Sequence, residues 1–385
     1  MIKYRQLLSY VLVAALASAI SLFAADTFWN QNRYSKLNQL SALIDECFIG
    51  EADWMDYEDA AAAAMVDALG DEWSYYIPAS QMQEHRLISN NTYVGIGISY
   101  IVRQEQDGFY VNEVNADGSA AEAGMLPGDV IVEIEGQSAA GMTAAEARNL
   151  IQGELNTQVQ LKVRRGDEII ELSVTRKEVP TSVATGQMLD GNIGLIIIED
   201  FDARCYDESR AAIEQLLADG AEALIFDIRF NHGGYKDEMV ALLDYLLPEG
   251  PLFHSEDYRG HVEVDNSDAG YLDIPMAVVV NSYSYSAAEL FAAAMMEYEA
   301  ATIVGQQTYG KGYYQTVFHL DDGSAVNLSI GRYTTPRGVN LTGVGITPDI
   351  VVEVDDETNV AIYAGVLAPE DDPQIQAAVS ALKAN

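Results

Sequence analysis

The stretch MAVVVNSYSYSAAELFAAAMME, residues 276–297, decides the fold of the C-terminal half of this chain. It begins with Met276–Val280, an uninterrupted apolar run that is typical of a strand buried on both faces. A polar turn follows, and Ser286–Glu297 then has the pattern of a helix. A strand, a turn and a helix in this order predict a βαβ unit of a largely parallel sheet.

The same alternation continues on both sides of this stretch. Further buried strands are expected at Ile193–Ile198, Ala223–Asp227 and Ala301–Val304. The helices expected between them are Tyr206–Leu217 and Asp237–Leu246. Two later runs, Gln315–His319 and Ala325–Ile330, flank Asp321-Asp322-Gly323 and predict a β-hairpin.

From Thr92 to about Glu178 the pattern changes to short β-branched or alternating runs, interrupted by two short helices. The strands expected there are Tyr93–Ile98, Phe109–Val114, Asp129–Ile134, Val159–Arg164 and Ile169–Thr175. The two glycines in Tyr93–Ile98 let backbone N–H groups converge on one small space, and such a nest binds a carboxylate. A peptide can then add as a strand along the exposed edge. Taken alone, the two glycines are a weak signal, because they also fit a bulge in the strand.

The N-terminal segment predicts a protein that functions outside the cytoplasm. Lys3 and Arg5 precede an uncharged stretch, Leu7–Ala25, which is about long enough to cross a bilayer as a helix, and Asp26 ends it. Positive charge before the stretch predicts a cytoplasmic N-terminus and an extracytoplasmic remainder. A cleaved signal peptide is the alternative. Because Phe23 is a poor fit to the cleavage pattern, we expect a retained single-pass anchor, and a secreted protein if the segment is cleaved.

Composition excludes some classes of partner. The 385 residues include 59 acidic and 21 basic side chains, a net charge of −38. A nucleic-acid binder needs Lys and Arg to displace counterions from phosphates, and the chain has no basic run, so we expect no nucleic-acid partner. Cys47 and Cys205 lie far apart, and no Cys/His spacing predicts a metal site. The sequence leaves open whether the two cysteines pair.

Three segments of the C-terminal half carry the candidate chemistry. Ser286 falls near the first turn of a helix, where free N–H groups and positive potential stabilise an oxyanion. Lys311 lies between two glycines, and a lysine acts as a base only when burial lowers its pKa. Gly233 and Gly234 follow an expected strand and can aim N–H groups at developing negative charge. Each feature also has a simpler alternative. Ser286 would cap the helix, Lys311 would be an exposed loop lysine, and the two glycines would form a tight turn.

Other nucleophile systems find less support. A cysteine nucleophile is not supported, because neither cysteine lies at a turn that leads into a helix. A Ser-His-Asp triad needs a well-placed histidine, and none of the histidines lies in the context of a GxSxG nucleophile elbow. The histidines are His85, His232, His254, His261 and His319.

Together these segments resemble the carboxyl-terminal processing (tail-specific) proteases of the S41 serine peptidase family. The family motif DLRxNxGG is similar to residues 227–234, VNxxSASASE to residues 280–289, and GxxTxGKGxxQ to residues 305–315. Gly343–Asp349 also matches a late family motif. The region from Thr92 onward resembles a PDZ domain, because the glycine loop is followed by Ala123–Ile131, which is similar to the turn AGLxPGDxI of that domain.

The resemblance implies a role for each matching residue. It makes Ser286 the nucleophile, Lys311 the general base and Gln315 the residue that orients the lysine. It assigns the oxyanion hole to backbone N–H groups of Gly233 or Gly234 and of Ala287. The residues expected to bind the C-terminus of a substrate are Val94, Gly95, Ile96, Gly97 and Ile98. It implies that the reaction needs neither a metal nor a cofactor. The substrates it implies are proteins or peptides with apolar C-termini, and it leaves open whether the chain forms a homo-oligomer.

The sequence departs from the family at two places. Tyr283 and Tyr285 replace small residues, and we expect them to narrow the site or to stack on substrate. Gln152-Gly153 stands where the family often has Arg-Gly, so a PDZ-controlled switch through that arginine is in doubt.

Two other functions are compatible with parts of this sequence. A catalytically weak PDZ-containing scaffold is the alternative, and the intact Ser286, Lys311 and Gln315 argue against it. A CoA-type enzyme would need basic residues around the CoA phosphates, and none is suitably placed.

The fold class expected is an α+β multidomain chain with an α/β protease core of the ClpP/crotonase-like type. The expected parts are a membrane segment (1–25), a helical region (26–90), a β-barrel-like PDZ domain (91–178), the protease core (179–368) and a C-terminal segment (369–385).

Overall fold

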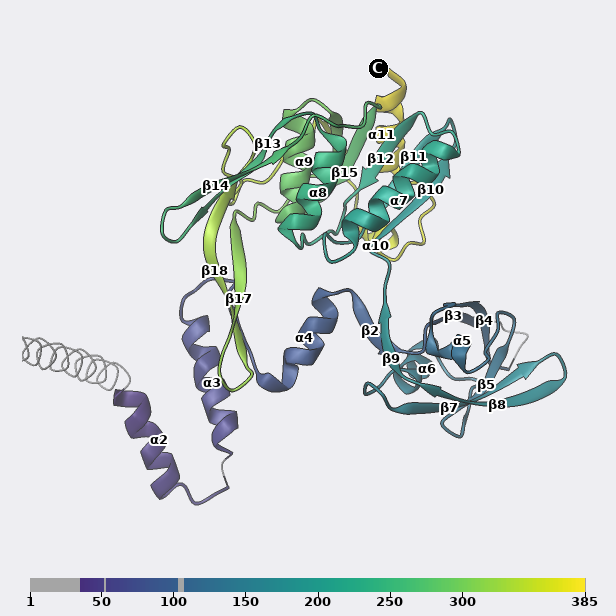
Figure 1. Cartoon of the computed structure of the whole chain (residues 1–385), viewed down its shortest axis with the longest axis vertical. Coiled ribbons are helices and arrows are strands. Elements are labelled where there is room, and N and C mark those ends of the chain that lie inside the picture. Colours follow the sequence, from purple (N-terminus) through teal and green to yellow (C-terminus); the bar gives the residue numbers. More distant parts are fainter. Residues whose placement is uncertain (1–34, 52, 103–106, 385) are drawn as a thin grey trace, which may run out of the picture. The chain divides into compact units, whose positions relative to one another are not determined.

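The computed structural model describes residues 35–51, 53–102 and 107–384 (Figure 1). These residues divide into two compact units, of which one ends at Gly70 and the other begins at Asp71. The membrane helix predicted within residues 1–25 lies outside the described residues. Within the described ranges, no helix combines the length and the apolar character that a bilayer span requires. The first unit contains helices α2 (Ser35–Cys47) and α3 (Trp54–Asp67).

The core of the second unit is a six-stranded sheet with the order β10-β11-β12-β15-β16-β19. β10 pairs antiparallel with β11, and the later pairs are all parallel. The strands are β10 (Ala184–Leu189), β11 (Ile193–Ile198), β12 (Ala223–Asp227), β15 (Met276–Val280), β16 (Ala301–Gly305) and β19 (Ile350–Val351). This agrees with the largely parallel sheet that the apolar runs predict.

Both faces of this sheet are covered by helices, because alternate residues of each strand enter different cores. In β12, Leu224 and Phe226 join the cluster formed with three helices, whereas Ala223 and Ile225 join a cluster with α11. The helices are α7 (Cys205–Ala218), α8 (Lys236–Leu246) and α9 (Ala287–Glu297) on one face and α11 (Pro373–Ala384) on the other. Burial of each large apolar side chain stabilises the fold by about 1.5–3 kcal/mol.

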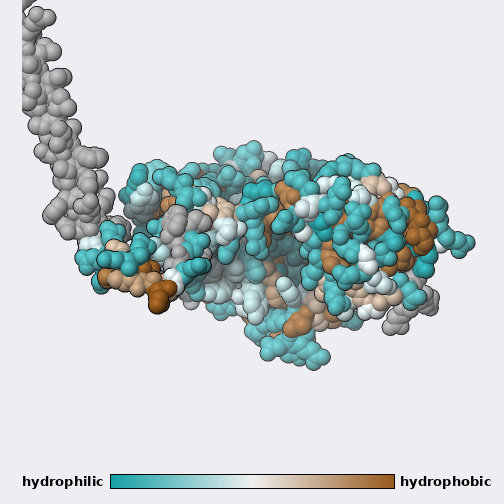
Figure 2. Space-filling view, turned by 90° about the horizontal axis from the view of Figure 1, so that it is seen from below, coloured by the Kyte–Doolittle hydropathy of each residue, from teal (hydrophilic) through white to brown (hydrophobic). Residues whose placement is uncertain are grey.

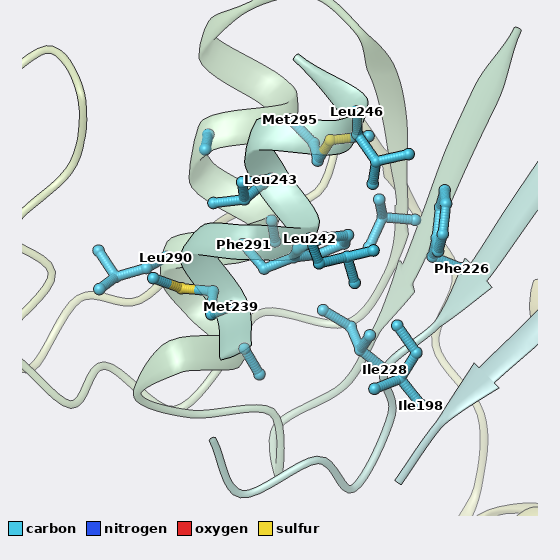
Figure 3. Packing of buried hydrophobic residues seen from close by; sticks show 14 of the residues in the cluster. Ile198, Phe226, Ile228, Met239, Leu242, Leu243, Leu246, Leu290, Phe291 and Met295 are labelled. Carbon is cyan, nitrogen blue, oxygen red and sulfur yellow. The ribbon is translucent and has the colours of Figure 1, made fainter. Parts of the chain in front are cut away.

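Helix α9 is the most deeply buried of the helices on its face. Every residue from Ala287 to Met295 is buried. Figure 3 shows side chains of α8 and α9 facing one another and the strands; those labelled are Ile198, Phe226, Ile228, Met239, Leu242, Leu243, Leu246, Leu290, Phe291 and Met295. This packing fixes the start of α9, and therefore the position of the residue before it, Ser286.

A second sheet of the core has the order β1-β18-β13-β14, and β17 also pairs with β18. Its strands are β1 (Tyr75–Ile77), β13 (Gly250–Asp257), β14 (Val262–Ser267), β17 (Tyr313–His319) and β18 (Ala325–Thr334). The predicted hairpin is present as β17 and β18, and β18 continues past its expected end at Ile330. Tyr75–Ile77, for which the sequence predicted no strand, pairs with β18. Trp73 thereby belongs to the second unit.

The region that resembles a PDZ domain forms a sheet of order β3-β4-β5-β7-β8, with β6 on β5, and a separate ladder of β2 and β9. Its strands are β2 (Thr92–Gly95), β3 (Ile98–Val102), β4 (Phe109–Val114), β5 (Val130–Ile134), β6 (Gln137–Ser138), β7 (Gln158–Arg165), β8 (Glu168–Thr175) and β9 (Lys177–Pro180). Its helices are α5 (Ser119–Glu122) and α6 (Ala144–Ile151). The prediction of a single strand over Tyr93–Ile98 is wrong. The segment is split into β2 and β3, and Gly97 between them adopts a φ of 75°.

Three shorter elements complete the described chain: η1 (Ala79–Gln81), α4 (Met82–Ser89) and α10 (Asp356–Tyr363). Both cysteines are free thiols, with Cys47 exposed and Cys205 buried. Hydrophilic residues cover most of the face seen in Figure 2, with hydrophobic residues in smaller patches, as a charge of −38 leads one to expect.

Candidate active site

Ser286 stands where strand β15 has turned into helix α9. It is the residue before the first helical residue, and its backbone has φ 62° and ψ −123°. A non-glycine residue rarely adopts such angles, and the strain is tolerated where the surrounding packing enforces it. A nucleophilic serine on a strained turn between a strand and a helix is the arrangement of the nucleophile elbow.

Glu289, one turn into α9, joins the nucleophile loop to the lysine loop. Its buried carboxylate accepts hydrogen bonds from the N–H groups of Ser286 (3.3 Å), Gly310 (2.7 Å) and Lys311 (2.9 Å). The hydroxyl of Thr308 also donates to it. Burial raises the pKa of Glu289, and these donors work against that rise. One carboxylate therefore fixes the backbone of both candidate catalytic residues.

The amine of Lys311 is held in an apolar and aromatic environment. The residue is 9% exposed, and Nζ lies 4.0 Å from the centroid of the Trp73 ring and 5.7 Å from that of Tyr285. Burial lowers the pKa of the amine to about 8, although Asp71, Glu289 and Glu72 oppose this change. A lysine with such a pKa is partly neutral near pH 7 and can accept a proton.

The rings around the amine form an aromatic cluster of Trp73, Tyr285, Tyr309 and His232. Tyr285 stacks on His232, with centroids 4.9 Å apart, and contacts Trp73 and Tyr309 at 5.4 Å and 5.6 Å. The second tyrosine near the nucleophile, Tyr283, stacks on Phe230. Both tyrosines, which we expect to narrow the site or to stack on substrate, thus stack on other side chains of the protein in this structure.

The glycine turn after β12 lies directly against the nucleophile. A Cβ atom on Gly233 would be 2.7 Å from the Cβ of Ser286, and Gly233 has a φ of 94°. Asn231 holds this turn, because its Nδ2 donates to the carbonyl of Ile198 (2.9 Å) and its Oδ1 accepts from the N–H of Gly233 (2.9 Å). The N–H of Gly233 is thus already engaged.

Two N–H groups beside the nucleophile remain available. Among the described residues, no acceptor is bonded to the N–H of Gly234 or of Ala287. Of the donors that the sequence proposed for the oxyanion hole, these two are the ones free to bind a developing negative charge.

Ser286, Lys311 and Gln315 line one cavity of about 510 Å³, together with Gly234 and Ala287. The phenol of Tyr333 lies in its wall and donates to the carbonyl of Lys311 (2.7 Å). Burial raises the pKa of this phenol, and the side chain of Ser286 works against that rise. Tyr333 therefore contacts both loops of the site.

Gln315 does not contact the lysine amine in the way that the sequence comparison suggests. Its Nε2 donates to the carbonyl of Tyr313 (3.1 Å) and to the hydroxyl of Ser329 (3.0 Å). Over the described ranges, Ser286 Oγ and Lys311 Nζ are likewise not joined by a hydrogen bond.

A second cavity of about 510 Å³ lies between β3 and α6 in the region that resembles a PDZ domain. Of the five residues predicted to bind a C-terminus, Ile96, Gly97 and Ile98 line it. Val94 and Gly95 instead form part of β2 and pair with Glu178 and Lys177 of β9. We call this cavity, with its open edge along β3, the PDZ groove.

Comparison with known proteins decides the family. Residues 192–352 match the sequence profile of peptidase family S41, and residues 110–165 match that of the PDZ domain. The chain is 31% identical over 361 residues to the carboxy-terminal processing protease CtpA of Bacillus subtilis (strain 168), covering 90% of this chain and 76% of that protein. The chain belongs to peptidase family S41. It is a serine peptidase of the carboxyl-terminal processing type and contains a PDZ domain.

Two further S41 relatives agree with this. The carboxyl-terminal-processing peptidase 2, chloroplastic, of Arabidopsis thaliana is 30% identical over 390 residues, which cover 90% of this chain and 76% of that protein. The crystal structure of an S41 protease from Bacteroides fragilis NCTC 9343 has a TM-score of 0.52 and 14% identity, and the match covers 90% of this chain and 97% of that one. The structural likeness supports the fold alone.

The S41 site also contains residues that the sequence did not single out. Trp73 comes from a distant segment, in the turn before the short strand β1, and no local sequence pattern places it beside Lys311. Asn231 and Glu289 lie inside the family motifs, but the sequence did not indicate which backbone groups their side chains bind. Tyr333 lies within a long strand, where an aromatic residue is ordinarily read as core.

Proposed function

We propose that this S41 peptidase is an endopeptidase that cuts exported proteins near or from their C-termini, with Ser286 as nucleophile and Lys311 as general base. The observation that carries the proposal is the shared cavity of the two residues, in which burial lowers the pKa of the lysine amine to about 8. At pH 7 about one tenth of such an amine is neutral, whereas an ordinary lysine is almost fully protonated.

The proposed reaction begins when the amine of Lys311 turns from Trp73 and takes the proton of the Ser286 hydroxyl. Ser286 Oγ then attacks the carbonyl carbon of the scissile peptide bond. As the carbon–nitrogen bond breaks, the ammonium of Lys311 returns its proton to the leaving amine. Lys311 next deprotonates a water molecule, and the resulting hydroxide attacks the carbonyl carbon of the acyl-enzyme. As the bond to Ser286 Oγ breaks, the ammonium of Lys311 returns its proton to that oxygen, and the new C-terminus is released.

The oxyanion of each tetrahedral intermediate is proposed to bind the N–H groups of Ala287 and Gly234. Both groups lie at the cavity and are unengaged among the described residues. The N–H of Gly233 would become a third donor if Asn231 released it. Donors fixed in this way stabilise negative charge without reorganisation, and one such donor contributes about 3–4 kcal/mol to catalysis.

The PDZ domain is proposed to bind the apolar C-terminus of the substrate in the PDZ groove, through β-strand addition to β3. The extracytoplasmic location and the retained anchor belong to the same proposal and rest on Lys3, Arg5 and Leu7–Ala25.

The test compares intact protein substrates by mass spectrometry after incubation with the unaltered chain, with Ser286→Ala and with Lys311→Ala. We expect C-terminal fragments from the unaltered chain alone, with both variants folded by circular dichroism. Cleavage by pure Ser286→Ala protein refutes the assigned nucleophile. Absence of cleavage by the unaltered chain, with substrate bound, would favour a binding scaffold.

A further inference from the structure

The PDZ groove has a charge character that differs from the rest of the molecule. Its apolar part is formed by Ile96, Ile98 and Ile151, and Tyr93 and Tyr100 add phenol groups. Arg148 of α6 also lines it. None of the described residues that line the groove is acidic, although the chain carries 59 acidic side chains.

Arg148 is a cation without a partner among the described residues. No ion pair or hydrogen bond to its guanidinium occurs there, and the side chain is exposed. The neighbouring acid on α6, Glu146, is occupied by the N–H and hydroxyl of Thr143 in the helix cap (2.8 Å each). The phenols of Tyr93 and Tyr100 lie close enough for Arg148 to oppose the rise that burial causes in their pKa. The guanidinium therefore faces the groove together with two phenols.

The direction of α6 relative to β3 determines which substrate residue would meet Arg148. The Tyr100 hydroxyl donates to the carbonyl of Ala144 (3.3 Å), so the later part of β3 lies beside the start of α6. Ile151 at the end of α6 belongs to the same core cluster as Ile96, which precedes β3. The two elements thus run in opposite directions, with the glycine loop at the C-terminal end of the helix.

A peptide added along β3, with its terminal carboxylate at Gly97, presents alternate side chains to α6. The last side chain then lies on the apolar part near Ile151, and the third from last lies about 6.6 Å farther along. Arg148 is three residues before Ile151, which is about 4.5 Å along the helix axis. Helical side chains lean toward the N-terminus of their helix, so the guanidinium covers the remaining distance.

We propose that the PDZ groove selects C-termini that carry Asp or Glu as the third residue from the end, with Arg148 as the residue that recognises this carboxylate. The inference rests on the proposed binding of substrate C-termini by the PDZ domain and adds a specificity beyond the apolar last residue. A guanidinium pairs with a carboxylate through two parallel hydrogen bonds. Such a local cation also offsets the repulsion that a chain of charge −38 exerts on an acidic peptide.

The test measures binding of fluorescent peptides to the full chain carrying Ser286→Ala, which prevents cleavage. Three peptides of equal length share an apolar last residue and differ in the third from last, which is Asp, Asn or Lys. We expect the Asp peptide to bind about three- to fivefold more tightly than the Asn peptide, and the Lys peptide to bind most weakly. In Arg148→Gln the Asp and Asn peptides should bind equally, and Arg148→Glu should favour Lys.

Arg164→Gln is the matched control, because Arg164 lies on β7 outside the described lining of the groove and its loss changes the net charge equally. It should retain the preference for Asp. Equal binding of Asp and Asn peptides by the unaltered groove, or a preference that survives Arg148→Gln, overturns the inference.

Peptides with an amidated C-terminus distinguish failure of the role given to Arg148 from failure of the proposed binding of C-termini. If they bind as well as free acids, recognition of C-termini itself fails. If the free carboxylate is required without an acidic preference, only the role of Arg148 fails.

Discussion

The amine of Lys311 lies 4.0 Å from the ring centroid of Trp73, over a residue that precedes the first strand of the core. The ring face attracts a protonated amine, whereas burial disfavours it. Burial lowers the pKa of the amine to about 8, and we expect the ring to favour the protonated form against this effect. Trp73, which is far from the family motifs in sequence, therefore contacts the amine that is proposed as the general base.

Replacement of Trp73 by Phe tests this relationship. Phe keeps an aromatic ring over the amine but attracts a cation less strongly than Trp does. We expect the pKa of Lys311 to fall by about half to one unit, and the acidic limb of the kcat/KM profile to move to lower pH by the same amount. Tyr75→Phe is the control, since its hydroxyl contacts His85 and not the lysine. An unchanged limb, or one moved to higher pH, would contradict the role given to Trp73.

Gly233→Ala tests the close approach of the glycine turn to the nucleophile. A Cβ atom there would be 2.7 Å from the Cβ of Ser286 and 3.0 Å from the N atom of Ala287, so the nucleophile must shift. We expect kcat to fall about a hundredfold, because displacement by about 1 Å has such an effect on aligned groups.

The control for this variant is Gly338→Ala. Gly338 has a similar φ of 80°, but a Cβ atom there has no neighbour within 4 Å. Both variants should lose about 1–3 kcal/mol of unfolding free energy from backbone strain, while Gly338→Ala keeps its activity. Equal kcat values for the two variants would show that the turn does not constrain Ser286.

Glu289→Gln tests the carboxylate that holds the loops of Ser286 and Lys311. The amide keeps the volume but directs an NH₂ group at the N–H donors of Gly310, Lys311 or Ser286. Leaving buried donors unsatisfied costs about 1–3 kcal/mol, so we expect the free energy of unfolding to fall by that amount in urea titrations, with a loss in kcat. Glu299→Gln, at an exposed acid just past α9, should change neither quantity. Unaltered stability of Glu289→Gln would exclude the clamp.

The parallel sheet could be predicted because its strands are buried on both faces and read as continuous apolar runs, as at Met276–Val280. β1 could not, since a three-residue strand with one exposed, one half-buried and one buried residue has no usable period. β13 and β14 mix polar and apolar residues, so burial on one face alone leaves a weak pattern.

In the candidate site, the sequence predicted the main residues but not the contacts between them. The motifs pointed to Ser286, Lys311 and the glycines, and these residues do line or adjoin one cavity. The partner of each group depends on contacts between distant segments, which local sequence does not encode. Trp73 over Lys311, and Asn231 on the N–H of Gly233, could be found only in three dimensions.

The central claim is that neutral Lys311 activates Ser286, and the pH dependence of covalent labelling tests it most directly. The measurement is the rate at which a fluorophosphonate probe attaches to the full chain between pH 5 and pH 9.5, with the modified residue identified by mass spectrometry. We predict attachment at Ser286, with a rate that rises about tenfold per pH unit and levels off near pH 8, and no such rise in Lys311→Met. Attachment at another residue, or the same pH profile in Lys311→Met, would contradict the account.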